Sequence, residues 1–299
     1  MAPLRSTAYL VECIAEVTGQ PIEVVTRRLA LEHRSPGSTV AAAIAELGLE
    51  PHHWSDGLAE FYVNSDAFLY ESVTWNRGPF KRDMRAWIGR WLAAHGQCPR
   101  RVLVWGDGPG FDSLYLALAG HQVTYVEPGH FSRQFARRLF ASWAASAPLV
   151  AGEEDIKPAS YDAALCLDVL EHVPSPPATI ARLAASLADG GCLFVHSPFY
   201  SICGTSSTHL AANVRLSGAL ERLYRPHGLS PVDARLFWNP LVLEKRCCGP
   251  WSRPVRTLPG QLIFSAARVW RAPHLLAERL SLLLTRRSLI RWGKAVSAR

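Results

Sequence analysis

Residues 101–129 read RVLVWGDGPGFDSLYLALAGHQVTYVEPG, and this stretch decides the fold. A short apolar run over 102–105 predicts a buried strand, which leads directly into a glycine-rich turn over 106–110. A helical pattern of leucines and alanines follows and ends at a glycine, and a second strand over 122–126 leads to Glu127. The order strand, glycine loop, helix, strand and acid is typical of the first half of a nucleotide-binding α/β sheet.

The spacing of the loop glycines favours one cofactor class over another. A dinucleotide fingerprint, Gly-x-Gly-x-x-Gly, would place its third glycine at Phe111, whereas this chain has Gly106, Gly108 and Gly110. A nicotinamide dehydrogenase is therefore disfavoured. Glu127 lies 21 residues beyond Gly106, where a carboxylate at the end of the second strand reaches ribose hydroxyls. A glycine turn in an α/β protein without a cofactor is the alternative interpretation of the loop alone.

A second informative stretch, LVAGEEDIKPASYDAALCLDVLEHVPSPP, covers residues 149–177. It predicts an acidic turn at Asp155, then a buried strand that ends at Asp168, then a loop with the sequence Leu-Glu-His-Val over 170–173. The glycine loop, the acidic turn and this LEHV motif resemble, in order and spacing, class I S-adenosyl-L-methionine (SAM)-dependent methyltransferases of the small-molecule type. The resemblance covers roughly residues 99–236.

This resemblance implies a Rossmann-like, mostly parallel seven-stranded sheet with helices on both faces, and SAM as the cofactor. By resemblance, the loop glycines hold the methionine and ribose parts, Glu127 binds the ribose hydroxyls, and Asp155 with Ile156 flanks the adenine. The family usually has an acid where this chain has Val104, and a common cysteine is replaced by Asp107, which we expect to take over part of the polar contacts near the methionine end. The expected cofactor-binding residues are Gly106, Asp107, Gly108, Gly110, Glu127, Pro128, Asp155, Ile156 and Asp168.

Three histidines are candidates for a general base, which a hydroxyl acceptor needs and an amine acceptor does not. His172 follows the strand that ends at Asp168, His196 lies at the end of the next predicted strand, and His209 lies on the loop after it. His172 belongs to the family motif, where it is often structural. Asp168 and His172 are four residues apart, a spacing that suits metal ligands on a helix, but no further ligand is spaced nearby, so we expect no metal.

The N-terminal region, residues 1–95, is expected to form a helical cap. Helices are predicted over 6–19, 21–33, 40–48 and 79–95, and aromatic residues are frequent over 50–80. In methyltransferases of this type such a segment often covers the cofactor and lines the substrate pocket, and ring faces attract a sulfonium cation. The methyltransferase core is expected over 96–240, with a helix over 213–229 and an antiparallel hairpin that closes the sheet.

The C-terminal region, residues 241–299, lies outside the resemblance and is expected to be a basic helical extension. Residues 245–299 hold 12 Lys/Arg and one acid, whereas the remainder holds 20 bases and 24 acids, so the basic character belongs to this extension. A basic amphipathic helix can contact a membrane surface or an acidic partner, or dock on the core. No nucleic-acid-binding motif is present, and the oligomeric state stays open.

Composition bounds the class of protein. Hydrophobic residues make up 48% and charged residues 19% of the chain, which indicates a globular protein with a sizeable core, and no run approaches the roughly 18 apolar residues of a membrane span. The N-terminus does not read as a signal peptide. The odd number of cysteines, seven without a Cys-x-x-Cys pair, predicts reduced thiols in a cytoplasmic protein.

The sequence therefore predicts an enzyme, a SAM-dependent methyltransferase that acts on an oxygen or nitrogen of a small-molecule acceptor. One alternative is a methyltransferase of a lipid or membrane-associated acceptor, which the basic extension supports. Another is a non-catalytic SAM-fold accessory protein, which the departure at Val104 permits.

Overall fold

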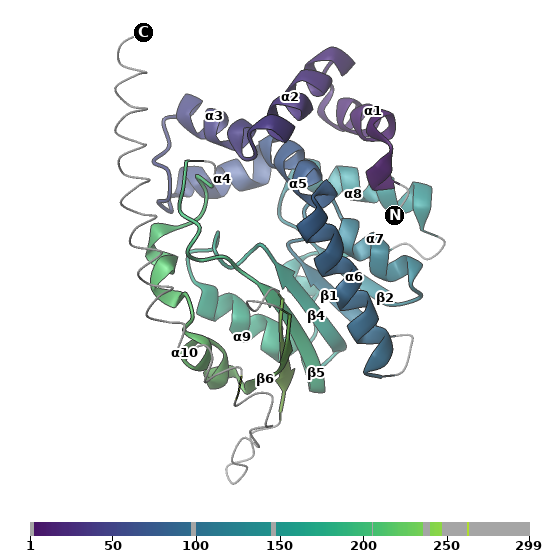
Figure 1. Ribbon diagram of the computed structural model, residues 1–299, viewed down its shortest axis with the longest axis vertical. Helices are drawn as coiled ribbons and strands as arrows, with labels where there is room; N and C mark the ends of the chain where they lie inside the picture. The colour runs from purple at the N-terminus through teal and green to yellow at the C-terminus, as the bar shows by residue number, and fades with distance from the viewer. Residues whose placement is uncertain are drawn as a thin grey trace.

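The computed structural model describes residues 3–96, 100–144, 148–204, 206–235, 240–246 and 262. At its centre is a seven-stranded sheet in the order β3-β2-β1-β4-β5-β7-β6 (Figure 1). The strands are β1 (Arg101–Trp105), β2 (Gln122–Val126), β3 (Leu149–Ala151), β4 (Tyr161–Leu167), β5 (Leu187–His196), β6 (Leu229–Ala234) and β7 (Leu241–Lys245).

The sheet is parallel except at one end. β1 pairs in parallel with both β2 and β4, while β7 runs antiparallel between β5 and β6. The strand order reverses between β1 and β4, and ligands bind open α/β sheets at the carboxyl ends of the strands at such a switch point. The predicted fold class, including the antiparallel closing hairpin, is confirmed, and β7 lies just beyond residue 240, where the core was expected to end.

Helices cover both faces of the sheet because each buried strand presents apolar residues to both sides. Val102 and Val104 of β1 pack with α6 (Pro79–Ala94), whereas Leu103 and Trp105 pack in the cluster that includes α9 (Pro176–Ser186). The other core helices are α7 (Phe111–Leu118), α8 (His130–Trp143) and the short α10 (Leu220–Tyr224).

The region before α6 is helical, as expected. Its helices are α1 (Thr7–Thr18), α2 (Ile22–Arg34), α3 (Ser38–Glu46), α4 (Asp56–Asn64) and α5 (Ala67–Arg77). Ser6 caps α1 by accepting from the Tyr9 amide, and Gly19 ends it with a left-handed conformation. Leu10 and Ile14 of α1 are fully buried and share a hydrophobic cluster with Phe135 of α8, so this cap is packed on the core.

Two expectations change with the structure. The helix predicted over 213–229 is broken into a 3₁₀ helix (Ala211–Leu216), α10 and a second 3₁₀ helix (Arg225–His227). Gly218 adopts a left-handed φ of 64° and Pro226 supplies no amide hydrogen, so a continuous helix cannot form there. The basic helical extension predicted for 241–299 lies, apart from residues 241–246 and 262, outside the described residues. Within the described part of the chain, every helix is too short or too polar to cross a bilayer.

Candidate active site

One large cavity opens at the carboxyl ends of the parallel strands. Its volume is about 1080 Å³, and it is lined by residues of α4 and α5 and of the loops that follow β1, β2, β4 and β5. Small-molecule sites span roughly 300–1,000 Å³, so this cavity has room for a cofactor and an acceptor together. Most of the predicted site residues line it: Gly106, Asp107, Gly108, Glu127, Pro128, Asp168, His172, His196 and His209.

The loop over 106–110 needs glycine for two separate reasons. Gly106, Gly108 and Gly110 all have positive φ angles, between 55° and 81°, which other residues rarely adopt. Close packing adds to this: a Cβ atom on Gly106 would lie 2.6 Å from Val169, and one on Gly110 would lie 2.7 Å from Phe140. Gly106 and Gly108 therefore offer bare backbone to the cavity, while Gly110 begins α7 and packs away from it.

Glu127 joins the loops that follow β1 and β2. Its carboxylate accepts hydrogen bonds from the amides of Gly108 (2.9 Å) and Gly129 (2.8 Å). Each carboxylate oxygen keeps a further lone pair, so the side chain can also accept from two vicinal hydroxyls. Burial raises the pKa of Glu127, and the two amide donors oppose that rise by stabilising the charged form.

The side chain of Asp107 forms hydrogen bonds with the first turn of α7, the helix that follows the loop. Its carboxylate accepts from the amides of Asp112 (3.1 Å) and Ser113 (2.7 Å) at the start of α7, where donors otherwise lack partners. Burial and the neighbouring Asp112 raise the pKa of Asp107 to about 7. The residue lines the cavity, but its observed hydrogen bonds hold the helix terminus, which is a role that the sequence did not predict.

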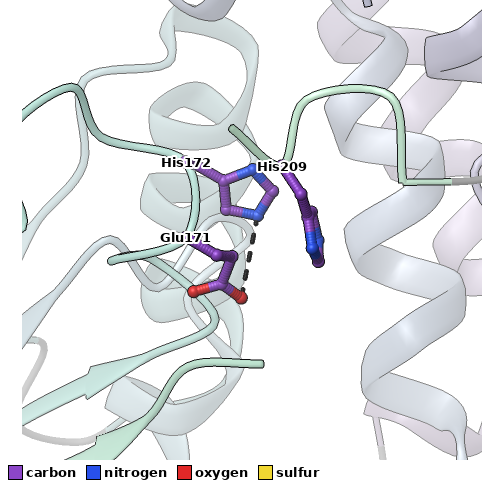
Figure 2. Close-up of side chains that lie close together, drawn as sticks. All are labelled: Glu171, His172 and His209. Atoms are coloured by element: carbon purple, nitrogen blue, oxygen red, sulfur yellow. Dashed lines mark ion pairs between the residues drawn. The ribbon is translucent and has the colours of Figure 1, made fainter. Parts of the chain in front are cut away.

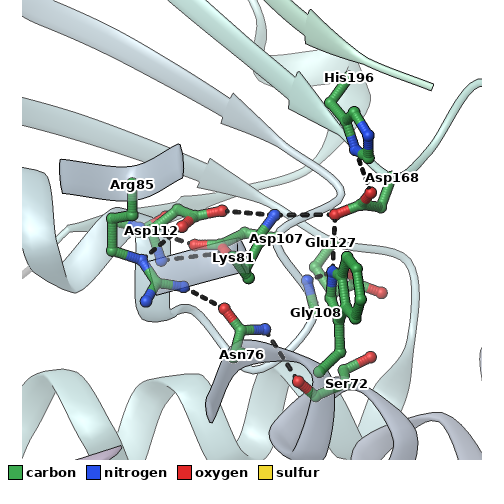
Figure 3. Close-up of polar contacts among 12 residues, drawn as sticks. Ser72, Asn76, Lys81, Arg85, Asp107, Gly108, Asp112, Glu127, Asp168 and His196 are labelled. Atoms are coloured by element: carbon green, nitrogen blue, oxygen red, sulfur yellow. Dashed lines mark hydrogen bonds and ion pairs between the residues drawn. The ribbon is translucent and has the colours of Figure 1, made fainter. Parts of the chain in front are cut away.

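Asp168 is the centre of a buried polar network (Figure 3). Its carboxylate accepts from Nδ1 of His196 (2.5 Å), Nζ of Lys81 (2.9 Å) and Nε1 of Trp75 (2.9 Å). The residue has a left-handed φ of 61°, which costs a non-glycine residue roughly 1–2 kcal/mol and turns the chain sharply at the end of β4. Although burial opposes ionisation, Lys81 and then His196 hold the pKa of Asp168 well below its usual range. Because Nδ1 of His196 donates to Asp168, its Nε2 is left as the basic nitrogen.

The network continues into the helix that precedes β1. Lys81 also lies 3.2 Å from Asp112, and Asp112 accepts from Nε of Arg85 at 2.6 Å. Arg85 in turn donates to the side chain of Asn76. Lys81 and Arg85 are about 5% exposed or less, and the two carboxylates raise the pKa of Lys81 despite its burial. Each buried charge in this network therefore faces an opposite charge.

A second cluster lines the same cavity and is built from histidines (Figure 2). Nδ1 of His172 lies 2.9 Å from the Tyr62 hydroxyl, and the rings of His172 and His209 meet edge to face with centroids 4.6 Å apart. Burial lowers the pKa of His172 to about 4 and that of His209 well below its ordinary value. Both rings are therefore neutral at pH 7.

Glu171 lies beside these histidines and is almost completely buried. One of its oxygens is 3.9 Å from Nε2 of His172, and neither oxygen has a hydrogen-bond partner among the described residues. Burial raises the pKa of Glu171 well above its ordinary value. One ligand atom each of Glu171, His172 and His209 lies within 4.8 Å of the others, and carboxylate with imidazole suits a divalent cation. The sequence paired His172 with Asp168 as possible ligands; the structure brings it to Glu171 and His209 instead, and the absence of a metal stays a prediction.

The two residues expected to flank adenine, Asp155 and Ile156, do not line the cavity. Asp155 is exposed and accepts from the amide of Gly152 in its own turn, while Ile156 packs against the core. Neither lines the cavity, although Glu153 of the same turn does and pairs with Arg182. The acidic residue of this turn that faces the cavity is thus two positions earlier than expected.

The residues that the sequence missed come from the N-terminal helices. Lys81 and Arg85 form ion pairs with the carboxylates of Asp168 and Asp112. Both residues precede β1 and belong to no motif. The one available signal is that both lie on the apolar face of α6, where a charged residue needs a buried partner. Of the aromatic residues of the 50–80 region, Trp54, Tyr62, Phe68, Trp75 and Phe80 line the cavity, whereas Phe61 and Tyr70 belong to the hydrophobic core.

Comparison with known proteins agrees with this geometry. Residues 42–240 match a family model described as a methyltransferase domain. A ubiquinone biosynthesis O-methyltransferase of Bordetella pertussis is 35% identical over 154 residues, which cover 50% of this chain and 61% of that protein. One of Burkholderia pseudomallei is 27% identical over 173 residues, covering 51% of this chain and 75% of that protein.

Among solved structures, magnesium protoporphyrin IX methyltransferase from Synechocystis PCC 6803 with bound SAM is similar. It has a TM-score of 0.45 and 24% identity, with 64% of this chain and 97% of that chain covered. The first of the curated relatives are matched over 61% and 41% of their length, so the chain spans about half the length of those proteins. The family model covers two thirds of the chain, and the chain belongs to the methyltransferase domain family.

Proposed function

We propose that this protein transfers the methyl group of SAM to an oxygen atom of a small-molecule acceptor. One observation carries the proposal: the glycine loop, Glu127 and the His196–Asp168 pair all line a single cavity at the switch point of the sheet. The relatives named as O-methyltransferases favour oxygen over nitrogen as the accepting atom. The LEHV motif over 170–173, which resembles that of small-molecule methyltransferases, supports a small-molecule acceptor.

SAM is the cofactor, and its parts have matching groups in the cavity. The bare backbone of Gly106 and Gly108 allows close approach of the methionine and ribose parts. Glu127 accepts from the ribose hydroxyls with the lone pairs that its two amide contacts leave free. The aromatic rings of Tyr62 and Trp75 line the same cavity and favour the positive sulfonium.

In this proposal His196 is the general base. The acceptor oxygen attacks the methyl carbon in line, the carbon–sulfur bond breaks, and S-adenosylhomocysteine leaves while the hydroxyl proton moves to Nε2 of His196 and then to solvent. Asp168 fixes the tautomer that leaves Nε2 basic and stabilises the imidazolium that forms. His209 is the second candidate, because it lines the cavity and burial keeps its ring neutral.

Calorimetry of SAM and S-adenosylhomocysteine tests the cofactor site first. Replacing Glu127 with Ala removes the ribose acceptor and the link between two loops, so we expect affinity to fall about tenfold or more, since a hydrogen bond to a charged group contributes roughly 1.5–3 kcal/mol. Glu127→Gln keeps the shape and tests the charge. Glu46→Ala, at an exposed position of α3, is the matched control and leaves affinity unchanged. Failure of the wild-type protein to bind either molecule would overturn the proposal.

A screen of phenols, catechols and amines then separates the remaining candidates. Turnover of a hydroxyl acceptor supports the proposal, whereas SAM binding without turnover on any acceptor favours a non-catalytic accessory protein. Turnover only on acceptors embedded in liposomes favours a membrane-associated acceptor. A cytoplasmic location and a membrane or acidic-partner contact through 245–299 stay predictions from the sequence.

A further inference from the structure

A second cavity, of about 770 Å³, lies between the N-terminal helices and the helices α6 and α7. Four arginines line it: Arg5 before α1, Arg77 at the end of α5, and Arg82 and Arg85 in α6. The described residues around this cavity include His33 and three threonines but no aspartate or glutamate. Figure 1 shows α2 beside α5, the helix that leads into α6.

The positive charge of this cavity is only partly matched. Arg85 is paired with Asp112, and Arg77 donates to the hydroxyl of Thr7 at 2.9 Å. The side chains of Arg5 and Arg82 form no hydrogen bond or ion pair with any residue in the described ranges. The neighbouring acid Asp83 does not compensate, because it pairs with Arg235 on the strand side. The exposed guanidinium groups of Arg5 and Arg82 thus border the cavity without a counter-charge among the described residues.

We propose that this cavity is an anion-binding site for a small molecule that carries phosphate groups. A guanidinium group presents paired N–H donors that match the oxygens of a phosphate, and several arginines around one cavity can share its charge. Thr7, Thr26 and Thr74 add hydroxyl donors to the same lining. Arg5 and Arg82 provide the charge, and Arg77, already held by Thr7, provides a positioned donor.

The site adjoins the active-site cavity without being part of it. His33, Thr74 and Arg77 line both cavities, so the two share a wall formed by α2 and α5. Arg5 and Arg82 line the second cavity alone, and they lie outside the residues assigned to the cofactor and to proton transfer. The proposal therefore does not rest on the methyl-transfer reaction and can be tested without an acceptor.

The test is titration of the full-length protein with inorganic pyrophosphate by calorimetry, at constant ionic strength and with saturating S-adenosylhomocysteine. We expect binding with a dissociation constant below about 1 mM, and a loss of about tenfold in affinity for Arg82→Gln and for Arg5→Gln. Arg90→Gln is the matched control, because Arg90 is an exposed arginine of α6 away from the cavity, and its affinity stays within about twofold. Thermal unfolding of each variant establishes that it is folded.

Three results would overturn the proposal. The first is the absence of binding at about 10 mM pyrophosphate, which excludes a specific site. The second is an equal loss in Arg90→Gln, which assigns the attraction to diffuse surface charge. The third is displacement of S-adenosylhomocysteine by pyrophosphate, which places the anion in the active-site cavity. Retained S-adenosylhomocysteine affinity in Arg82→Gln, together with lost pyrophosphate affinity, supports two separate sites.

Discussion

Two polar clusters lie beside the same cavity, and they differ in how their charged groups are paired. In the first, Asp168 and Asp112 face Lys81 and Arg85, so that every carboxylate has a cation within 3.2 Å. In the second, Glu171 lies among neutral histidines, and its oxygens have no hydrogen-bond partner in the described part of the chain. We name them the paired cluster (Lys81, Arg85, Asp112, Asp168) and the unpaired cluster (Glu171, His172, His209).

The difference shows how local charge decides the state of a buried carboxyl group. Asp168 and Glu171 are three residues apart, and Asp168 is half-buried while Glu171 is buried, yet the pKa of Asp168 is held well below its usual range and that of Glu171 is raised well above it. The deciding neighbour is Lys81, which reaches Asp168 at 2.9 Å. The ion pairs of the paired cluster therefore fix the positions of its side chains. The groups of the unpaired cluster can instead change their protonation or bind a ligand.

Replacing Lys81 with Met breaks the paired cluster and has the largest expected effect. It leaves Asp112 and Asp168 with one cation fewer in a buried place, and breaking a buried pair by removing one partner typically costs about 3–5 kcal/mol. We expect a loss of that size in the free energy of unfolding, measured with urea at pH 7. The unpaired cluster offers no equivalent loss, because no lysine or arginine in the described part of the chain forms an ion pair with Glu171.

Lys157→Met is the control, since Lys157 is an exposed lysine in the turn before β4. We expect a change within about 0.5 kcal/mol for this variant. Equal stability of Lys81→Met and Lys157→Met would contradict the view that ion pairing holds this side of the site.

Replacing His196 with Gln removes the proposed base while Asp168 keeps Lys81 and Trp75 as partners. Positioned proton transfer contributes about 10²–10⁴-fold, so we expect kcat to fall about a hundredfold on a hydroxyl acceptor. The affinity for S-adenosylhomocysteine should stay within about threefold, because His196 is not assigned to the cofactor. Steady-state kinetics and calorimetry on the same preparation measure both.

The same substitution at His53, an exposed histidine, is the control and leaves kcat unchanged. If His196→Gln retains full activity while His209→Gln loses it, the base belongs to the unpaired cluster and the assignment to His196 is wrong.

The sequence predicted the parts of the site that follow from local backbone chemistry. Gly106 and Gly110 require positive φ angles and leave no room for a side chain, and Glu127 follows directly from its strand. These are properties of a loop and its neighbours, so a short stretch of sequence contains them. The continuous apolar run over 102–105 likewise predicted a buried strand, and β1 is buried on both faces.

The paired cluster could not be predicted in the same way. Lys81 meets Asp168 across 87 positions, and nothing in either local sequence specifies the other. The sequence likewise could not distinguish the three acidic residues of the 153–155 turn, because only the fold decides that Glu153 lines the cavity. Contacts made by tertiary packing carry no periodic signal along the chain.

A change in pH also tests the difference between the two clusters. We expect it to have the smallest effect, a modest loss in the free energy of unfolding. Burial lowers the pKa of His172 to about 4, against about 6.5 in an unfolded chain. Between these two values the unfolded chain binds the proton and the folded protein does not, so stability is fully present above pH 6.5 and is lost as the pH falls toward 4. From pH 7 to pH 5 we expect His172 to account for a loss of about 2 kcal/mol in the free energy of unfolding.

The measurement compares the wild-type protein with His172→Gln at both pH values. Other groups that titrate in this range, such as Asp107 with its pKa of about 7, are present in both proteins and largely cancel in the difference. The variant should therefore lose about 2 kcal/mol less than the wild type, whereas His53→Gln should follow the wild type because His53 is exposed. An identical loss in all three proteins would mean that His172 ionises as freely in the fold as in water. Glu171 would then have a charged partner after all, and the contrast between the two clusters would disappear.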